Sequence, residues 1–190
     1  MSGSLAERRR ATYADLEQVA PHLVAEIIDG VLYTSPRPGS PHARAASVLG
    51  IDLGGPFYRG RGGPGGWVIL DEPELHLGPE PDVLVPDLAG WRRERMPEVP
   101  DAPAFTLAPD WICEVLSAST EAIDRAEKMP VYAREGVQHL WLVDPVLQTL
   151  ESYRLEAGAW RLLKTYRGDR VVRAEPFDAI ELDLAALWAR

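Results

Sequence analysis

The chain has 190 residues and a net charge of -9, with 46% hydrophobic and 26% charged residues. This acidity argues against a protein that simply coats nucleic acid, because phosphate neutralisation calls for a basic surface. Cys113 is the only cysteine, which excludes an intrachain disulfide and a zinc site of clustered cysteines. We expect a frayed segment over residues 1–10 and a single domain over 11–190. No signal core or membrane-length apolar stretch is evident, so we expect a cytoplasmic protein.

The N-terminal part is predicted to form two helices separated by a hairpin. The first helix is expected from Thr12 to about Val19. The hairpin covers residues 26–33, and Asp29-Gly30 supplies its turn. The second helix covers residues 42–53. The segment that follows, 54–66, is rich in Gly, Pro and Arg and is predicted to be a mobile connection.

The rest of the chain contains short apolar runs that predict strands, at residues 67–70, 74–77, 81–85, 111–116 and 139–143. We expect residues 88–109 to be irregular, because they hold several prolines and arginines. A helix is predicted from Glu121, with a kink or restart at Pro130. An antiparallel meander near residues 150–172 and a short helix over 182–188 complete the chain. This order of elements predicts an α/β fold with a mixed sheet.

Three charged residues stand out against these apolar runs. Asp82 and Glu114 interrupt predicted strands, and Lys128 lies on the helix that follows. A charge inside a strand that is fit for burial is costly unless it is paired or holds a metal. Carboxylates at sheet positions suit Mg²⁺ or Mn²⁺, which take oxygen ligands. Such a metal would lower the pKa of a bound water and neutralise charge on phosphorus, and Lys128 would assist that water.

A structural role for the same residues is the alternative. In that interpretation Asp82 caps a turn and Glu114 lies at a sheet edge. Lys128 then pairs with Asp124 four residues earlier on the helix, a contact worth about 0.3–0.5 kcal/mol at a surface. Residue chemistry alone leaves both interpretations open.

Seven features of the chain, taken in order, form one pattern: Glu-Ile-Ile-Asp-Gly at 26–30, Pro-Asp at 81–82, Glu-Val-Leu-Ser-Ala-Ser-Thr at 114–120, Asp124 with Lys128, Tyr132, Gly136-Val137, and Trp-Leu-Val-Asp-Pro at 141–145. This pattern resembles the Uma-type family of restriction-endonuclease-like proteins, within the PD-(D/E)XK nuclease superfamily. The resemblance runs from about residue 12 to 185. It implies a restriction-endonuclease-like core, in which helices flank a mixed central sheet, here with an additional C-terminal antiparallel meander.

The resemblance also implies roles for individual residues. By position, Asp82 corresponds to the superfamily's aspartate and Glu114 to its second acid, and both would bind the metal. The superfamily's lysine would stand two residues after Glu114, where this chain has Leu116. Lys128 would then reach the same site from the helix. Glu26 is a further candidate acid, with a role at a strand edge as its alternative, and His42 is a candidate base or phosphate contact, with helix capping as its alternative.

Two functions follow from these observations. The first is a metal-dependent endonuclease that hydrolyses DNA, with Asp82, Glu114, Lys128 and Glu26 as its catalytic residues and Mg²⁺ or Mn²⁺ as its cofactor. RNA or another phosphodiester would suit the same site. The second is a catalytically inactive module on the same fold, which acts through protein partners or a homodimer. A two-fold dimer would also suit cleavage of both DNA strands.

Overall fold

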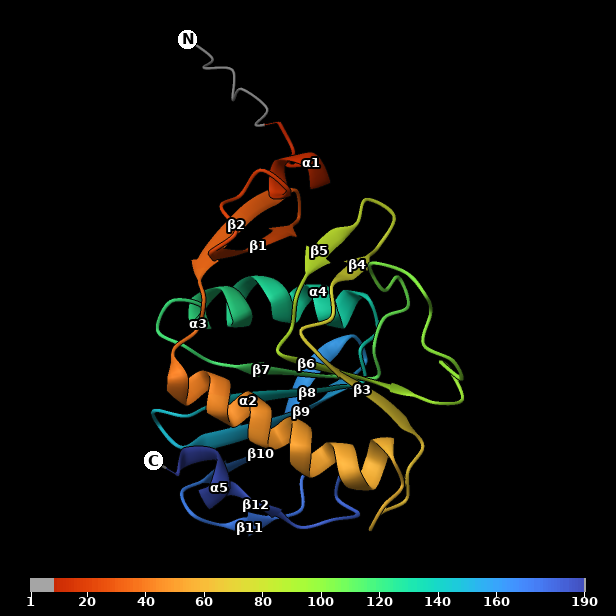
Figure 1. The fold of residues 1–190 in the computed structure, drawn as a ribbon, viewed down its shortest axis with the longest axis vertical. Coiled ribbons are helices and arrows are strands. Elements are labelled where there is room, and N and C mark those ends of the chain that lie inside the picture. The colour runs from red at the N-terminus through yellow and green to blue at the C-terminus, as the bar shows by residue number, and fades with distance from the viewer. Residues whose placement is uncertain (1–8, 190) are drawn as a thin grey trace.

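The computed structural model describes residues 9–189, and its centre is a six-stranded sheet with the order β10-β9-β8-β7-β6-β3 (Figure 1). Its neighbouring strands are antiparallel except for β7 and β8, which are parallel. The sheet is therefore mixed, as predicted. Its strands are β3 (Trp67–Asp71), β6 (Leu88–Arg92), β7 (Trp111–Val115), β8 (His139–Asp144), β9 (Thr149–Glu156) and β10 (Ala159–Arg167).

A second sheet of four strands has the order β2-β1-β5-β4 and is antiparallel throughout. Its strands are β1 (Leu23–Ile28), β2 (Val31–Pro36), β4 (Leu75–Leu77) and β5 (Asp82–Leu84). The β1–β2 hairpin turns at Asp29 and Gly30, which both have a positive φ, and this confirms the predicted turn. A third sheet pairs β11 (Val171–Val172) with β12 (Leu182–Asp183).

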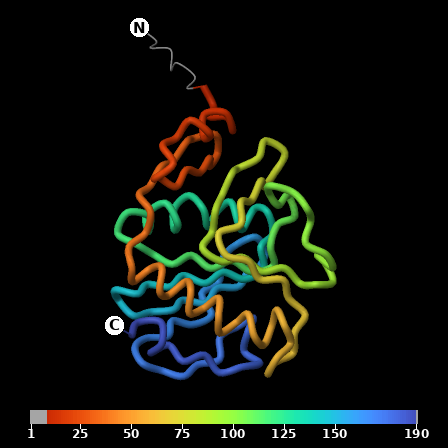
Figure 2. Tube along the Cα trace, in the orientation of Figure 1, coloured from red at the N-terminus to blue at the C-terminus, as the bar shows by residue number. Residues whose placement is uncertain are grey.

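Helices separate and cover the sheets. They are α1 (Tyr13–Leu16), α2 (Ser40–Leu53), α3 (Glu121–Ile123), α4 (Met129–Arg134) and α5 (Leu184–Trp188), with two π-helical turns, η1 (Gly54–Tyr58) and η2 (Asp124–Lys128). In Figure 1 the four-stranded sheet, the α3–α4 segment, the six-stranded sheet, and α2 with α5 follow one another as layers. Figure 2 traces the same path, with the β1–β2 hairpin and the C-terminal segment at opposite ends of the molecule. No helix of residues 9–189 is long and apolar enough to cross a membrane.

Strand β7 shows how the sequence divides the core. Trp111, Cys113 and Val115 belong to a buried cluster with α2 and the C-terminal segment. Ile112 and Leu116 belong to a second buried cluster with α4 and the four-stranded sheet. Successive side chains of a strand point to opposite faces, so both faces of β7 are covered. Glu114 has the parity of Ile112 and therefore points toward α4.

Three details of the predicted elements are corrected. Residues 88–92 form the inner strand β6, although residues 88–109 were expected to be irregular. The segment 54–66 is not a free connection, because Gly65 N–H donates to Pro56 O at 2.9 Å and Arg61 N–H donates to Gly55 O at 2.9 Å. Of the predicted meander, β9 and β10 extend the main sheet, whereas β11 pairs with β12.

The predicted frayed N-terminus lies, for residues 1–8, outside the described part of the chain. Arg9 pairs with Asp15 at 2.7 Å, and Ala11 N–H donates to Gly30 O at 2.8 Å. The chain is thus tied to the β1–β2 hairpin from its first described residues.

Gly90 explains why β6 fits between two tryptophan-bearing strands. A Cβ at this position would lie 3.1 Å from Trp111 and 3.3 Å from Trp67, and both rings are fully buried. We predict that Gly90→Ala lowers the free energy of unfolding by about 1–3 kcal/mol, because the packed rings have little room to yield. Urea denaturation measures the change.

Gly54→Ala is the matched control for this substitution. Gly54 has helical φ and ψ, and a Cβ there would meet nothing within 4 Å. Alanine at such a position leaves stability unchanged or raises it by roughly 0.4–1 kcal/mol. Equal unfolding midpoints for the two variants would contradict the packing argument.

Candidate active site

Lys128 is the centre of a buried charge cluster. Three carboxylate oxygens lie close to its Nζ: Glu26 Oε1 at 3.0 Å, Glu114 Oε1 at 3.2 Å and Asp124 Oδ1 at 3.3 Å. All four residues are buried. They come from β1, β7 and η2, so the cluster joins the small sheet, the large sheet and the helix between them. The pair of Lys128 with Asp124 is thus present, but it is buried and shared with two more carboxylates, unlike the exposed pair of the structural alternative.

The π-helical turn η2 places Lys128 beside Asp124. Met129 N–H donates to Asp124 O, a bond that spans five residues instead of the α-helical four. Pro130 follows directly and has no N–H to donate, so the helix restarts as α4, as the sequence predicted. Single π-turns within helices are frequent at functional sites. Here the turn aims two charged side chains of one helix into the same buried space.

Glu114 is held from two sides at one oxygen. Its Oε1 accepts a hydrogen bond from Tyr132 Oη at 2.6 Å, in addition to the contact from Lys128. Burial raises the pKa of Glu114 well above its usual value, and Lys128 opposes the shift. The carboxylates of Asp124, Asp87 and Glu26 add to the rise. The site thus confines more negative charge than one ammonium group neutralises.

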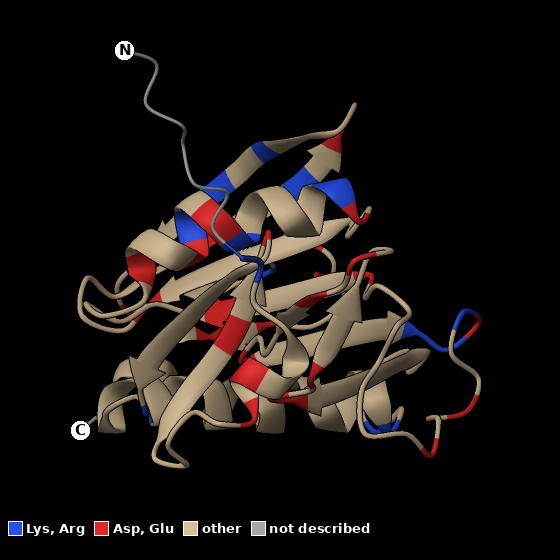
Figure 3. Ribbon diagram, turned by 90° about the horizontal axis from the view of Figure 1, so that it is seen from above, with Lys and Arg blue, Asp and Glu red and all other residues tan. Residues whose placement is uncertain are grey.

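Burial and the neighbouring charges also shift the pKa values of Lys128 and Asp124. Burial lowers the pKa of Lys128, but the carboxylates of Glu114 and Glu26 outweigh it, so the net shift is upward and the side chain stays charged. Burial also raises the pKa of Asp124, against the opposing charge of Lys128. Figure 3 shows acidic positions recurring on strands and loops through the middle of the molecule, whereas basic positions lie mostly toward its periphery.

Asp87 is a fifth charged group of the site, and it sits immediately before β6. Its Oδ2 accepts a hydrogen bond from Val115 N–H at 2.6 Å, next to Glu114 in the chain. Its Oδ1 lies 3.2 Å from His42 Nε2. His42 comes from the first turn of α2 and is buried, and its Nδ1 has no hydrogen-bond partner among the described residues. Asp87 therefore links the carboxylate cluster to the start of α2.

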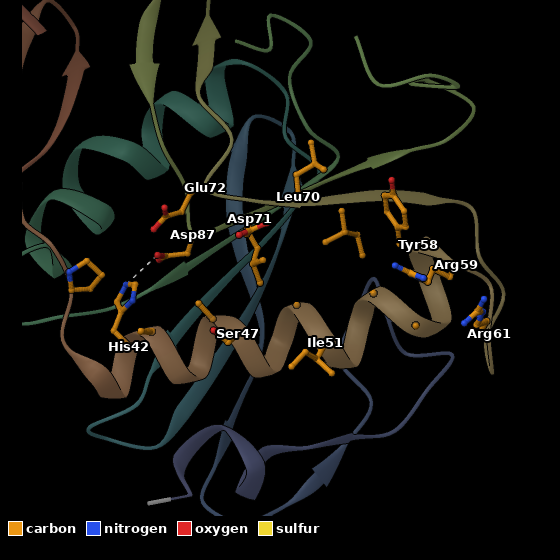
Figure 4. A pocket seen from close by; sticks show the side chains of 18 residues that line it. His42, Ser47, Ile51, Tyr58, Arg59, Arg61, Leu70, Asp71, Glu72 and Asp87 are labelled. Carbon is orange, nitrogen blue, oxygen red and sulfur yellow. Dashed lines mark ion pairs between the residues drawn. The ribbon is translucent and has the colours of Figure 1, made fainter. Parts of the chain in front are cut away.

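A cavity of about 310 Å³ opens onto these groups. Its lining includes Glu26, Asp87, Glu114, Asp124 and Lys128. It adjoins a larger cavity of about 850 Å³ that runs along α2, since His42, Glu72 and Asp87 line both (Figure 4). The charged groups can thus be reached from a preformed recess.

The donor chemistry of the site fits a hard divalent cation, although residues 9–189 contain no ready group of three metal-ligating His, Cys, Asp or Glu side chains. Mg²⁺ is commonly held by one or two carboxylates, with water and substrate phosphate as its other ligands. Asp87 and Glu114 are the carboxylates that adjoin at the cavity. The excess of buried negative charge around Lys128 also favours an added cation.

Of the four predicted catalytic residues, the structure brings together Glu26, Glu114 and Lys128 and leaves Asp82 apart. The Asp82 carboxylate accepts a hydrogen bond from Asp29 N–H at 2.6 Å and pairs with Arg134. It does not line the cavity of about 310 Å³. Its role in the described structure is to fix the β1–β2 turn against α4.

The sequence interpretation overlooked Asp87, although a signal for it was present. The chain contains four Pro-Asp pairs, at 81–82, 86–87, 100–101 and 109–110, and only the first was weighed. The second stands directly before an inner strand of the large sheet. Tyr132 is buried in the core, and its hydroxyl also donates a hydrogen bond to Glu114.

Removal of the ammonium group tests the charge cluster. We predict that Lys128→Met lowers the free energy of unfolding by about 3–5 kcal/mol near neutral pH, because it leaves three buried carboxylates without a counter-charge. The loss should shrink as the pH falls. The pKa values of Glu114 and Asp124 are already raised, so these groups take up protons early on acidification and no longer need the ammonium. Urea denaturation across a pH series measures both effects.

Lys164→Met is the control, because Lys164 is the chain's only other lysine and lies exposed on β10. A surface change of this kind stays within about 0.5 kcal/mol. Similar losses for the two variants, or a loss at Lys128 that grows at low pH, would contradict the cluster's energetics.

Comparison with known proteins identifies the family and the fold of the chain. Residues 10–185 match the family described as Uma2, putative restriction endonuclease. A solved structure from Anabaena variabilis ATCC 29413, described as a putative nuclease belonging to DUF820, is 22% identical, with a TM-score of 0.66 over 87% of this chain and 90% of that chain. This likeness confirms the predicted fold. No curated protein matches the chain. Because the family match spans nearly all the described residues, the chain belongs to the Uma2 family of putative restriction endonucleases.

Proposed function

We propose that the protein is an endonuclease that hydrolyses phosphodiester bonds of DNA with the help of Mg²⁺ or Mn²⁺. The observation that carries the proposal is the buried Lys128, which three carboxylates surround beside a fourth, Asp87, at the wall of a cavity. A fold needs no such arrangement for stability, since apolar residues of similar volume are often as stabilising as buried ion pairs. The family match supports the same activity.

Asp87 and Glu114 are the residues that would hold the metal. When bound, the ion would lower the pKa of a water molecule and neutralise charge that develops on the phosphate. Asp87 is oriented by Val115 N–H and His42, and Glu114 by Tyr132. Both carboxylates are thus fixed before any ligand arrives, which is what efficient electrostatic catalysis requires.

Lys128 would provide the positive charge that meets the substrate. Its ammonium group has three N–H donors, and three carboxylates surround it. A phosphate oxygen or the attacking water would accept a hydrogen bond from this ammonium group by replacing one of the three carboxylates. Glu26 and Asp124 keep the ammonium charged and in position, and they are positioning residues in this scheme. Hydrolysis then adds the water oxygen to phosphorus and its proton to the leaving oxygen.

Cleavage of supercoiled plasmid with Mg²⁺ or Mn²⁺ tests the proposal and separates the role of Asp87 from that of Asp82. We predict that Asp87→Asn lowers the rate by at least about 10²-fold, as does loss of other electrostatic groups in active sites. Asp82→Asn serves as the matched control and should retain most of the activity, because Asp82 lies outside the cavity. Gel electrophoresis of the plasmid forms over time gives the rates.

Two outcomes would count against this assignment. Equal loss in both variants would mean that Asp87 has no special part in the chemistry. A folded protein that cleaves no form of DNA would favour the inactive binding module instead.

Metal binding provides a test that does not depend on turnover. Isothermal titration with Mn²⁺ should show one site in the native chain and in Asp82→Asn, and a much weaker site or none in Asp87→Asn and Glu114→Gln. The physical reason is the loss of one of two anionic oxygen ligands. Unchanged Mn²⁺ affinity in both site variants would refute the proposed ligands even if the protein cleaves DNA.

A further inference from the structure

The larger cavity lies between α2 and β3, and its size suits a nucleotide. It encloses about 850 Å³, within the range of small-molecule sites. Figure 4 shows its two ends: His42, Glu72 and Asp87 lie at the start of α2, whereas Tyr58, Arg59 and Arg61 lie beyond its end. The recess therefore leads away from the candidate active site along one helix.

The charge of this cavity changes sign along its length. The end that it shares with the active site carries the carboxylates of Glu72 and Asp87. The far end carries the guanidinium groups of Arg59 and Arg61. Within residues 9–189, neither arginine is ion-paired with a carboxylate. In a chain of net charge -9, two uncompensated arginines in one recess favour an anionic ligand.

The loop that carries the arginines is folded onto η1. Arg59 N–H donates to Gly54 O at 3.0 Å, and Arg61 N–H donates to Gly55 O at 2.9 Å. Gly63 packs so closely on Pro56 that a Cβ there would come within 2.3 Å of it. The backbone positions of both arginines are thus set by the π-helical turn, which lowers the entropic cost of binding a phosphate.

Most groups that line the middle of the cavity are small or apolar. Gly50, Gly54, Ile69 and Leu70 leave it open, the ring of Tyr58 borders it, and Asp71 adds a carboxylate between Leu70 and Asp87. Arg93 lies over that ring at 5.5 Å and also donates to Tyr58 O at 3.4 Å. Arg93 therefore holds the ring in place, and the ring gives this end of the cavity an aromatic surface. Aromatic rings of this kind bind unpaired bases without regard to sequence.

We propose that this cavity binds an unpaired stretch of the substrate strand that leads away from the bond that is cut. A base of this stretch occupies the space beside Tyr58, and a phosphate several nucleotides from the scissile one contacts Arg59 and Arg61. The inference rests on the proposed function, which places the scissile phosphate at Asp87 and Glu114. It adds that the substrate is single-stranded or locally opened, because a base enters a cavity only after it leaves the duplex stack.

Fluorescence anisotropy with a short fluorescein-labelled oligothymidine tests the cavity without cleavage, in buffer that contains EDTA. The variant Arg59→Ala/Arg61→Ala should bind roughly tenfold more weakly, because charged hydrogen bonds to phosphate are lost. The slope of log K against log salt should also fall by about 1.4, since each phosphate contact to a single strand contributes about 0.7.

Arg167→Ala/Arg170→Ala is the matched control, because it removes the same charge from exposed positions outside both cavities. It should leave affinity and slope near those of the native chain. Equal effects of the two double variants would overturn the inference, and plasmid cleavage by the native protein would then still uphold the proposed nuclease.

Ser47→Trp tests the path of the strand separately from the arginines. Ser47 is exposed on α2 and lines the cavity between its two ends, so a large ring there narrows the recess without entering the core. We expect lower affinity for oligothymidine and an unchanged unfolding midpoint. Unchanged affinity in this folded variant, or equally strong competition by a blunt duplex, would overturn the inference.

Discussion

The burial of one ammonium group among three carboxylates is the constraint on which this structure depends. Lys128 can stay charged at 4% exposure only because Glu26, Glu114 and Asp124 surround it. Those partners come from two sheets and the helix between them. The same contact that satisfies the charge therefore fixes the distance between the layers, and the layers in turn hold the cavity walls apart. The pairing of the buried charges and the packing of the layers therefore depend on each other.

Much of the fold could be predicted from the sequence, because local patterns determine it. The Asp29-Gly30 turn, the alternation along 111–116 and the restart of the helix at Pro130 each follow from short-range rules, and each is confirmed. Strand β6 escaped prediction for a physical reason. Its residues 88–92 include Gly90, which weakens a strand pattern locally but is required by the tryptophans on both neighbouring strands.

The candidate site was predictable in part. The sequence interpretation grouped Glu26, Glu114 and Lys128, with Glu26 added through the family resemblance, and the structure places both carboxylates beside the ammonium group. The choice between Asp82 and Asp87 could not be made locally, because both follow a proline and they stand at the two ends of the same apolar run, residues 83–85. Only the pairing of β6 with β7 decides which carboxylate adjoins Glu114. Strands β6 and β7 are separated by residues 93–110, and short-range sequence patterns do not predict which distant strands pair.

The π-helical turn η2 has an evolutionary consequence. A bond from Met129 N–H to Asp124 O includes one residue more than an α-helical turn does. Deletion of a single amino acid within 124–128 would restore ordinary helical geometry and rotate every preceding side chain by about 100° relative to α4. Homologues that lost this residue would keep a well-formed helix, but Asp124 would approach Lys128 from a different angle. Such a one-residue gap in an alignment would mark chains in which this buried cluster is rearranged.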